Sequence, residues 1–292
     1  MFEKNATTVV LLLVCPDTTG IVSNLSSFIY NNGGCIVDSD FHNDHQHGYF
    51  LGRIEWFLDG FKIKREDIKE KVAKLCDPYN GKWSLHFSDT PIKVAIWCSK
   101  QDHCVLDLLW RNQAKELGNA EISVILSNHP DLKPKIDTFG IPFICIPMNK
   151  ENKPEVEQKQ IELMREYNIN VVVLAKYMQI LSDNLVDTLG KDGRTVINIH
   201  HSFLPAFIGA KPYHQAHKRG VKIIGATAHF VTAQLDAGPI IEQDVVRISH
   251  RDTVNDLIRK GKDLEKIVLA RALRLHLLHK VLTYENKTVV FE

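Results

Sequence analysis

Three polar residues in the second half of the sequence have side chains that can act together on a carbonyl group. Asn198 and His200 are two positions apart at the end of an apolar run, so both face the same side if the run is extended. Asp236 lies in a turn-forming stretch at 235–239. An amide, an imidazole and a carboxylate that meet can polarise a carbonyl, stabilise its oxyanion and move protons. The spacing also fits structural roles, with Asn198 as a cap, His200 as a hydrogen-bonded histidine and Asp236 as a turn residue.

The segments around these residues predict an α/β domain with a mostly parallel sheet. Apolar, β-branched runs alternate with helix-like segments, which is typical of parallel strands covered on both faces. The runs lie at 93–98, 122–126, 143–146, 171–175 and 195–199, and the helix-like segments at 106–117, 132–139 and 154–167. Later runs at 223–231 and 240–248 fit an antiparallel pair, and an amphipathic helix closes the domain near 264–278. Ligands of open α/β sheets bind beyond the carboxyl ends of the strands, where Asn198 and His200 are expected.

The first 88 residues predict a separate, ferredoxin-like unit with the order βαββαβ. Strands are expected at 8–15, 35–42, 49–58 and 83–87, and helices after Gly20 and at 66–75. Residues 88–91 read as a linker, so the predicted domains are 1–88 and 91–292.

Composition limits the classes of function. The chain has 292 residues, of which 44% are hydrophobic and 24% charged, and a net charge of +1, which fits a soluble globular protein with no overall field for nucleic acid or an anionic membrane. No apolar run approaches the roughly 20 residues that span a bilayer, and the early apolar run lacks the flanks of a signal peptide. Six cysteines without a C-x-x-C pair indicate reduced thiols in the cytoplasm.

No metal and no cofactor are expected. Five histidines fall between 200 and 229, but they form no H-E-x-x-H motif and no cysteine pair accompanies them. We expect His214 and His217, three residues apart, on the exposed face of a short helix after Pro212. The glycine patterns of nucleotide-binding loops are missing as well.

Three motifs in the second domain resemble those of the folate-dependent formyltransferases. The stretch from Asn198 to Phe207 is similar to the N-I-H-x-S-x-L-P signature of that family. The segments 229–231 with 236–241, and 174–181, resemble its other two motifs, and the order of the three agrees. The resemblance covers about residues 91–292 and implies a Rossmann-like catalytic domain. The first unit resembles an ACT domain, a regulatory or assembly module, with residues 16–21 in its ligand-loop position.

The combination resembles the hydrolytic branch of the family, which converts 10-formyltetrahydrofolate and water into tetrahydrofolate and formate. Such a role would supply formate for purine synthesis and balance the one-carbon folate pool. The resemblance implies that Asn198 and His200 hold the formyl oxygen, while Asp236 orients and charges His200 and relays protons. It also implies a set of folate contacts. These are Tyr177, Met178, Ile180, Leu181, His229, Val231 and Gly238.

The departures from the family pattern favour water as the acceptor. The related glycinamide ribonucleotide transformylases carry a Gly-Ser-rich loop after their first strand that holds the acceptor's phosphate. The corresponding segment here, 98–104, has no glycine and contains Asp102 beside Lys100. His201 replaces a proline and Lys176 a glycine of the family pattern; Lys176 could reach the folate glutamate tail or be a solvated lysine. Transfer to an amine remains the alternative, whereas the methionyl-tRNA formyltransferases append a C-terminal domain that is not expected after Lys280.

A second alternative is an amino-acid sensor with secondary catalysis. The resemblance to ACT domains implies an effector such as glycine or methionine. Its site would be lined by Asp17, Thr18, Gly20 and Ile21. A homo-oligomer is expected because an isolated ferredoxin-like unit exposes a sheet edge or face that pairing can cover.

Overall fold

The chain folds into two compact units. The computed structural model describes residues 6–206 and 212–291. The first unit comprises Met1–Pro91 and Leu278–Glu292, and the second comprises Ile92–Leu277. The predicted second domain, 91–292, is therefore too long, because its last residues pack into the first unit.

The first unit has the predicted order of strands and helices. Its elements are β1 (Thr8–Pro16), α1 (Ile21–Asn31), β2 (Ile36–Asp44), β3 (Tyr49–Phe57), α2 (Arg65–Cys76), the short helix η1 (Asp77–Tyr79) and β4 (Lys82–Phe87). The strands form an antiparallel sheet in the order β2-β3-β1-β4. Ile21, Leu25 and Ile29 of α1, at helical spacing, pack with α2 onto one face of this sheet.

A C-terminal hairpin belongs to the first unit and was not predicted. It consists of β12 (Val281–Tyr284) and β13 (Lys287–Val290), joined at Glu285 and Asn286, where Glu285 has a φ of 51°. One hydrophobic cluster joins hairpin and sheet; it contains Val10, Leu12, Leu51, Leu282 and Phe291. Residues of β1 alternate in side, so Val10 and Leu12 lie opposite the face that α1 and α2 cover.

The second unit contains a seven-stranded, mostly parallel sheet, as predicted. Its strands are β5 (Ile92–Cys98), β6 (Ala120–Ser127), β7 (Phe143–Cys145), β8 (Val171–Ala175), β9 (Thr195–His200), β10 (Ile223–Phe230) and β11 (Ile240–Arg247). Their order is β11-β10-β9-β8-β5-β6-β7. The five strands from β7 to β9 are parallel, while β10 runs antiparallel to both β9 and β11, as the later pair was expected to do.

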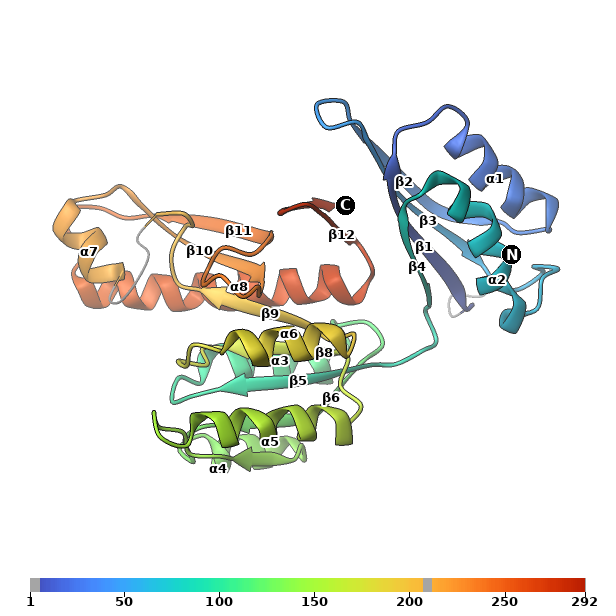
Figure 1. Cartoon of the computed structure of the whole chain (residues 1–292). Coiled ribbons are helices and arrows are strands. Elements are labelled where there is room, and N and C mark those ends of the chain that lie inside the picture. The colour runs from blue at the N-terminus through green and yellow to red at the C-terminus, as the bar shows by residue number, and fades with distance from the viewer. Residues whose placement is uncertain (1–5, 207–211, 292) are drawn as a thin grey trace. The chain divides into compact units, whose positions relative to one another are not determined.

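Helices cover this sheet. They are α3 (His103–Gln113), α4 (Lys133–Ile136), the short helix η2 (Asp137–Phe139), α5 (Lys153–Glu166), α6 (Asp183–Lys191), α7 (Pro212–Arg219) and α8 (Val254–Leu277). Helices α5 and α6 pack on one face, with Trp97 and Leu174 in the shared core. Helix α8 lies along β10 and β11 (Figure 1). Helix α6 was not predicted, although Ser182 is a typical N-cap whose hydroxyl accepts a hydrogen bond from the Leu185 N–H.

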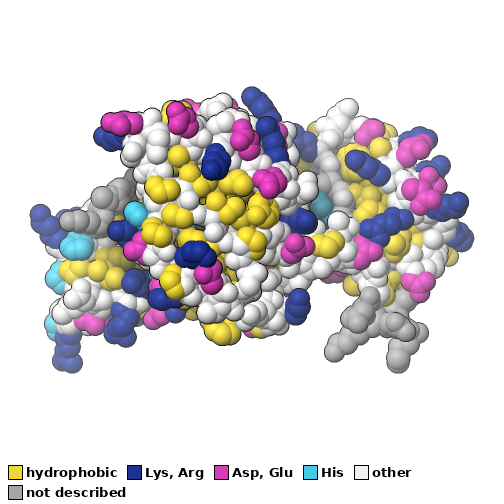
Figure 2. Space-filling model, turned by 90° about the horizontal axis from the view of Figure 1, so that it is seen from below, with side chains coloured by type: hydrophobic (Ala, Val, Ile, Leu, Met, Phe, Trp, Pro, Cys, Tyr) yellow, Lys and Arg dark blue, Asp and Glu magenta, His cyan; other side chains and the backbone are white. Residues whose placement is uncertain are grey.

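The mixed surface charge and the free thiols agree with what the composition predicts. On the face shown in Figure 2, Lys and Arg side chains are interspersed with Asp and Glu side chains. All six cysteines are free thiols. Among the described residues, no helix combines the length and the apolar character needed to cross a membrane.

Candidate active site

Two neighbouring antiparallel strands bring the predicted polar residues together. Strand β9 carries Asn198 and His200, and β10 places His229 directly opposite Asn198. Asp236 follows β10 in the loop that leads to β11. The predicted meeting of the amide, the imidazole and the carboxylate is therefore present, and His229 joins it.

Asp236 lies between two imidazoles. Its Oδ2 is 3.3 Å from Nδ1 of His200, and its Oδ1 is 3.7 Å from Nε2 of His229. Hydrogen bonding to His200 holds the pKa of the Asp236 carboxyl well below its usual range despite partial burial. The residue has a φ of 53°, a region that Asp tolerates better than most residues. Asp236 is therefore an ionised carboxylate aimed at His200.

His229 fixes the orientation of Asn198. Its Nδ1 lies 2.8 Å from the carbonyl oxygen of Phe230, which can only accept, so Nδ1 carries the hydrogen. In the neutral ring Nε2 is then an acceptor, and it lies 3.2 Å from Nδ2 of Asn198. His229 thus holds the Asn198 amide in one orientation through a buried contact. The sequence motif included His229 but did not indicate this role.

His200 has one nitrogen left for chemistry. Its Nδ1 faces Asp236, and Nε2 is buried without a hydrogen-bond partner among the residues that the structure describes. An unpaired buried nitrogen destabilises the folded protein, because it has lost its hydrogen bonds to water. Such atoms are therefore uncommon, and a catalytic role is one explanation for them. The Nε2 atom is thus available to a reacting group.

The chain after β9 is held in place by residues that sequence reasoning missed. The hydroxyl of Thr227 donates to the carbonyl of Ser202 and accepts from the N–H of Leu204. The Gln243 amide donates to the Thr227 hydroxyl and the Leu204 carbonyl. These buried contacts come from β10 and β11, so only the strand pairing could reveal them. Phe207, the last residue of the first motif, lies outside the described residues.

The predicted folate contacts divide into exposed and buried residues. Met178 and Ile180 are 57% and 61% exposed and follow β8. Tyr177, in contrast, is a core residue: it packs edge-on against Trp97, and its hydroxyl accepts a hydrogen bond from Gln160. The Tyr177 side chain therefore lies inside the domain core, and the expected contact of Tyr177 with the pterin stays a prediction.

Three other predicted contacts, Leu181, Val231 and Gly238, have structural roles around the site. Leu181 and Val231 are partly buried and pack against the core. A Cβ at Gly238 would come within 1.8 Å of the carbonyl oxygen of Phe230, so glycine is required for the close approach of the loop. Gly238 thereby shapes the loop that carries Asp236.

Exposed apolar side chains gather in the segments that follow the strands. Besides Met178 and Ile180, Phe203 after β9 and Leu235 beside Asp236 are 42% and 59% exposed. Exposed large apolar side chains near polar groups are typical of a ligand-binding surface. Phe203 and Leu235 were not predicted as contacts because single exposed residues leave no periodic pattern.

A second cluster of charged groups is buried in the same unit. Lys176 is neither solvated nor free to reach a ligand tail: its side chain is 4% exposed, and its Nζ lies 3.2 Å from Oε2 of Glu265. The same oxygen accepts a hydrogen bond of 2.8 Å from Nε2 of His103. Both alternatives considered for Lys176 are thus wrong.

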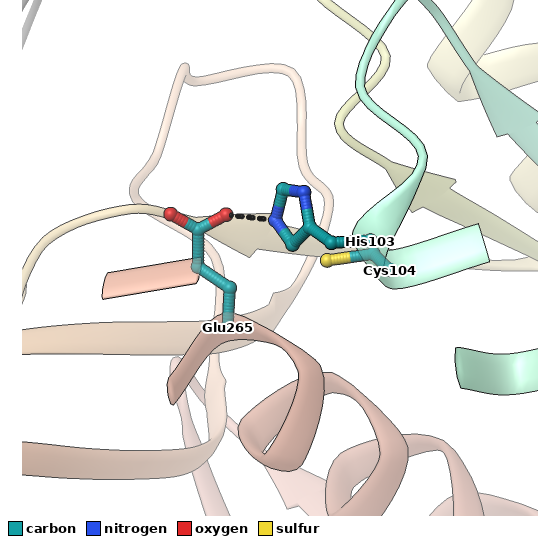
Figure 3. A group of neighbouring side chains, drawn as sticks. All are labelled: His103, Cys104 and Glu265. Carbon is teal, nitrogen blue, oxygen red and sulfur yellow. Dashed lines mark hydrogen bonds and ion pairs between the residues drawn. The ribbon is translucent and has the colours of Figure 1, made fainter. Parts of the chain in front are cut away.

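His103, Cys104 and Glu265 lie close enough to suggest a metal site (Figure 3). Burial raises the pKa of the Cys104 thiol, whereas a metal ligand would need the thiolate. Lys176 already supplies a positive charge to Glu265, and its charge, together with hydrogen bonds from His103 and Tyr213, lowers the pKa of that carboxyl to about 2 against the effect of burial. The cluster is therefore an ion-pair network. His214 and His217 are exposed on α7, as expected.

The residues predicted for an effector line a hollow in the first unit. Asp17, Thr18, Gly20 and Ile21 border a cavity of about 490 Å³ at the start of α1. Gly20 has a φ of 94°, which only glycine adopts readily, and no side chain caps the helix. Asn43 donates a hydrogen bond to the Asp17 carboxylate.

Comparisons with known proteins agree with this architecture. The formyl transferase family model matches residues 92–273. The chain is 56% identical to the formyltetrahydrofolate deformylase of Synechocystis, over 97% of this chain and 98% of that one. A formyltetrahydrofolate deformylase structure from Pseudomonas syringae has a TM-score of 0.95 at 42% identity, covering 100% of this chain and 96% of that one. The phosphoribosylglycinamide formyltransferase of Anaplasma phagocytophilum has a TM-score of 0.62 at 28% identity, covering 70% of this chain and 96% of that one. The chain therefore belongs to the formyl transferase family, among the formyltetrahydrofolate deformylases.

Proposed function

We infer that the chain hydrolyses 10-formyltetrahydrofolate to tetrahydrofolate and formate. The observation that carries this function is the 3.3 Å contact between His200 and Asp236, with Nε2 of His200 unpaired within the described structure and Asn198 on the same strand. The extensive identity to deformylases supports the same reaction. The transferase and sensor alternatives are not favoured by these relatives.

We assign the roles from the hydrogen-bonding capacity of each side chain. The Asn198 amide and protonated His200 donate to the formyl oxygen and stabilise the tetrahedral intermediate. Asp236 keeps the Nδ1–H of His200 oriented and stabilises its charged form. Water adds to the formyl carbon, the bond between that carbon and N10 breaks, and N10 gains the proton that water loses.

No protein nucleophile is required for this reaction. The formyl group is already bound to the nitrogen that leaves, and N10 takes up the proton that the attacking water loses. The pKa of buried Cys98 is raised to about 12 and that of Cys76 likewise, so these thiols are poor nucleophiles. We therefore propose that 10-formyltetrahydrofolate is the substrate and that no further cofactor takes part.

The segment after β5 supports water rather than a phosphorylated amine as the acceptor. Ser99 uses its hydroxyl to contact Asn128 and the Met178 N–H. Asp102 is paired with Lys135, which holds the pKa of the Asp102 carboxyl below its usual range. These residues serve the protein's own contacts, whereas a phosphate cradle needs free backbone N–H groups.

The reaction class is tested by incubating the purified chain with 10-formyltetrahydrofolate, with and without glycinamide ribonucleotide. We expect equal amounts of formate and tetrahydrofolate without any amine, and no formylated amine when the ribonucleotide is added. Release of tetrahydrofolate that depends on the ribonucleotide would instead establish a transferase.

We further propose that the first unit is an ACT domain that binds a small amino acid at the start of α1. The uncapped N–H groups of an eleven-residue helix favour a carboxylate, and Asp17 offers a charge for the ammonium group. Calorimetric titration with glycine and with methionine tests this. Saturable binding that Asp17→Asn weakens is expected, while formate release without any binding would leave the unit as an assembly device.

A homo-oligomer is the other expectation for the first unit. Strand β2 is an edge strand, and Ile36 and Val37 on it are 40% and 45% exposed. Unpaired edges that expose apolar residues favour pairing with another copy. Light scattering of the purified chain should give a multiple of 33.3 kDa, and a mass of one chain would refute this proposal.

A further inference from the structure

The buried ion-pair network occupies the place in this fold where a ligand is usually found. The strand order shows that the chain leaves β5 toward β6 on one side and later returns to β8 on the other. In open α/β sheets, ligands bind in the crevice beyond the strand ends at such a switch point. Here His103 begins the helix after β5, and Lys176 directly follows β8. Both reach Glu265 of α8.

This network adjoins the proposed catalytic residues. Leu174 pairs in register with Asn198, and Lys176, just past the end of β8, and His200, at the end of β9, each follow this pair by two residues. His201 stacks on His200 with ring centroids 5.3 Å apart and lies 6.1 Å from the ring of Tyr213. Tyr213 in turn donates a hydrogen bond of 2.6 Å to Glu265. The charged network is thus linked to His200 through Tyr213 and His201.

Lys176 sits in this position at a clear energetic disadvantage. Its charge is buried, and burying an ion pair removes both charges from water at a cost that mutual attraction need not recover. Its φ of 63° is unfavourable for a lysine, whereas a glycine adopts this angle without steric strain. Strained and buried charged residues concentrate at functional sites, so we consider a functional role for Lys176.

We propose that Lys176 and Glu265 fill the acceptor side of the active site, so that water alone reaches the formyl carbon. The inference rests on the proposed hydrolysis. The Lys176 ammonium occupies the site beside Glu265 that the amine of an acceptor would otherwise use. The related formyltransferase is named for phosphoribosylglycinamide, an acceptor far larger than water.

Removing the Lys176 side chain should therefore let an amine compete with water. In that reaction the amine nitrogen bonds to the formyl carbon, the bond to N10 breaks, and the proton lost by the amine goes to N10. Lys176→Gly is the suitable variant because glycine fits the observed φ. Lys176→Met is the matched control, since it restores a side chain of similar length without the charge.

The experiment uses the full chain, 10-formyltetrahydrofolate and glycinamide as the amine, with formate and formylglycinamide measured together. Wild type and Lys176→Met should yield formate only. In Lys176→Gly the ratio of formylglycinamide to formate should rise at least about tenfold, the size of effect that filling a pocket produces.

The result that overturns the inference is a Lys176→Gly variant that releases formate but forms no more formylglycinamide than wild type. If that variant does not fold, Lys176→Gly combined with Glu265→Gln leaves no unpaired buried charge, and the same outcomes apply to it. Absence of formate with wild type would instead refute the proposed hydrolysis, so the two failures are distinct.

Discussion

Asp236 connects the imidazoles of the site, and each of its oxygens faces a different ring. The residue types and the two-residue spacing of Asn198 and His200 were enough to predict the meeting of amide, ring and acid. The spacing could not show that His229 holds Asn198, because that contact depends on the register between β9 and β10. The sequence alone also could not predict that Tyr177 and Lys176 are buried, because burial depends on how the whole domain packs.

At the residue scale, we predict that His229→Phe lowers kcat by about tenfold to a hundredfold with little change in KM, because a freed Asn198 loses its orientation. Steady-state formate release measures this. The control is His214→Phe, the same change on the exposed face of α7, which should leave both constants unchanged. An unaltered kcat in His229→Phe would show that the orientation of Asn198 does not depend on His229.

At the scale of elements, apolar runs predicted the parallel strands of the second unit because burial on both faces leaves a continuous signal. Short elements were not predicted from the sequence: α6 is nine residues long, and each strand of the C-terminal hairpin has four residues. The hairpin's partner sheet lies far away in sequence, so nothing local in 281–290 shows which domain it joins. Its packing against β1 explains why the first unit includes both ends of the chain.

We therefore predict that Phe291→Ala destabilises the first unit by about 3–5 kcal/mol, the usual effect of removing a buried phenylalanine. Denaturant unfolding followed by circular dichroism measures it. Tyr30→Ala, which truncates a side chain that is 80% exposed on α1, should change stability by less than about 0.5 kcal/mol. Equal effects of the two variants would mean that the hairpin does not stabilise the unit.

At the scale of the whole molecule, each unit contains a histidine that burial keeps neutral. Burial lowers the pKa of His86 in the first unit and of His201 in the second to about 4. The unfolded chain, with ordinary histidine pKa values near 6.5, binds more protons between pH 4 and 6.5. Stability should therefore rise with pH through this window and level off above it, while Glu265 acts only at lower pH because its pKa is lowered to about 2.

We predict that His86→Phe weakens this pH dependence. The phenylalanine ring keeps the stacking on His279 but cannot titrate. Thermal unfolding at pH 5 and pH 7.5 should show a smaller difference in Tm for the variant than for wild type. His45→Phe, in the exposed turn between β2 and β3, serves as the control and should retain the wild-type difference. An unchanged difference in His86→Phe would assign the pH dependence to other groups.

The central claim, that Asp236 orients and stabilises the protonated His200 that holds the formyl oxygen during attack by water, is tested most directly by formate release from Asp236→Asn. The asparagine keeps the size of the side chain and removes the charge that orients and stabilises protonated His200. We predict that kcat falls by about 10²-fold or more, while Asp244→Asn, on neighbouring β11 and paired with Arg271, retains wild-type turnover. Near-wild-type formate release by a folded Asp236→Asn variant would contradict the account.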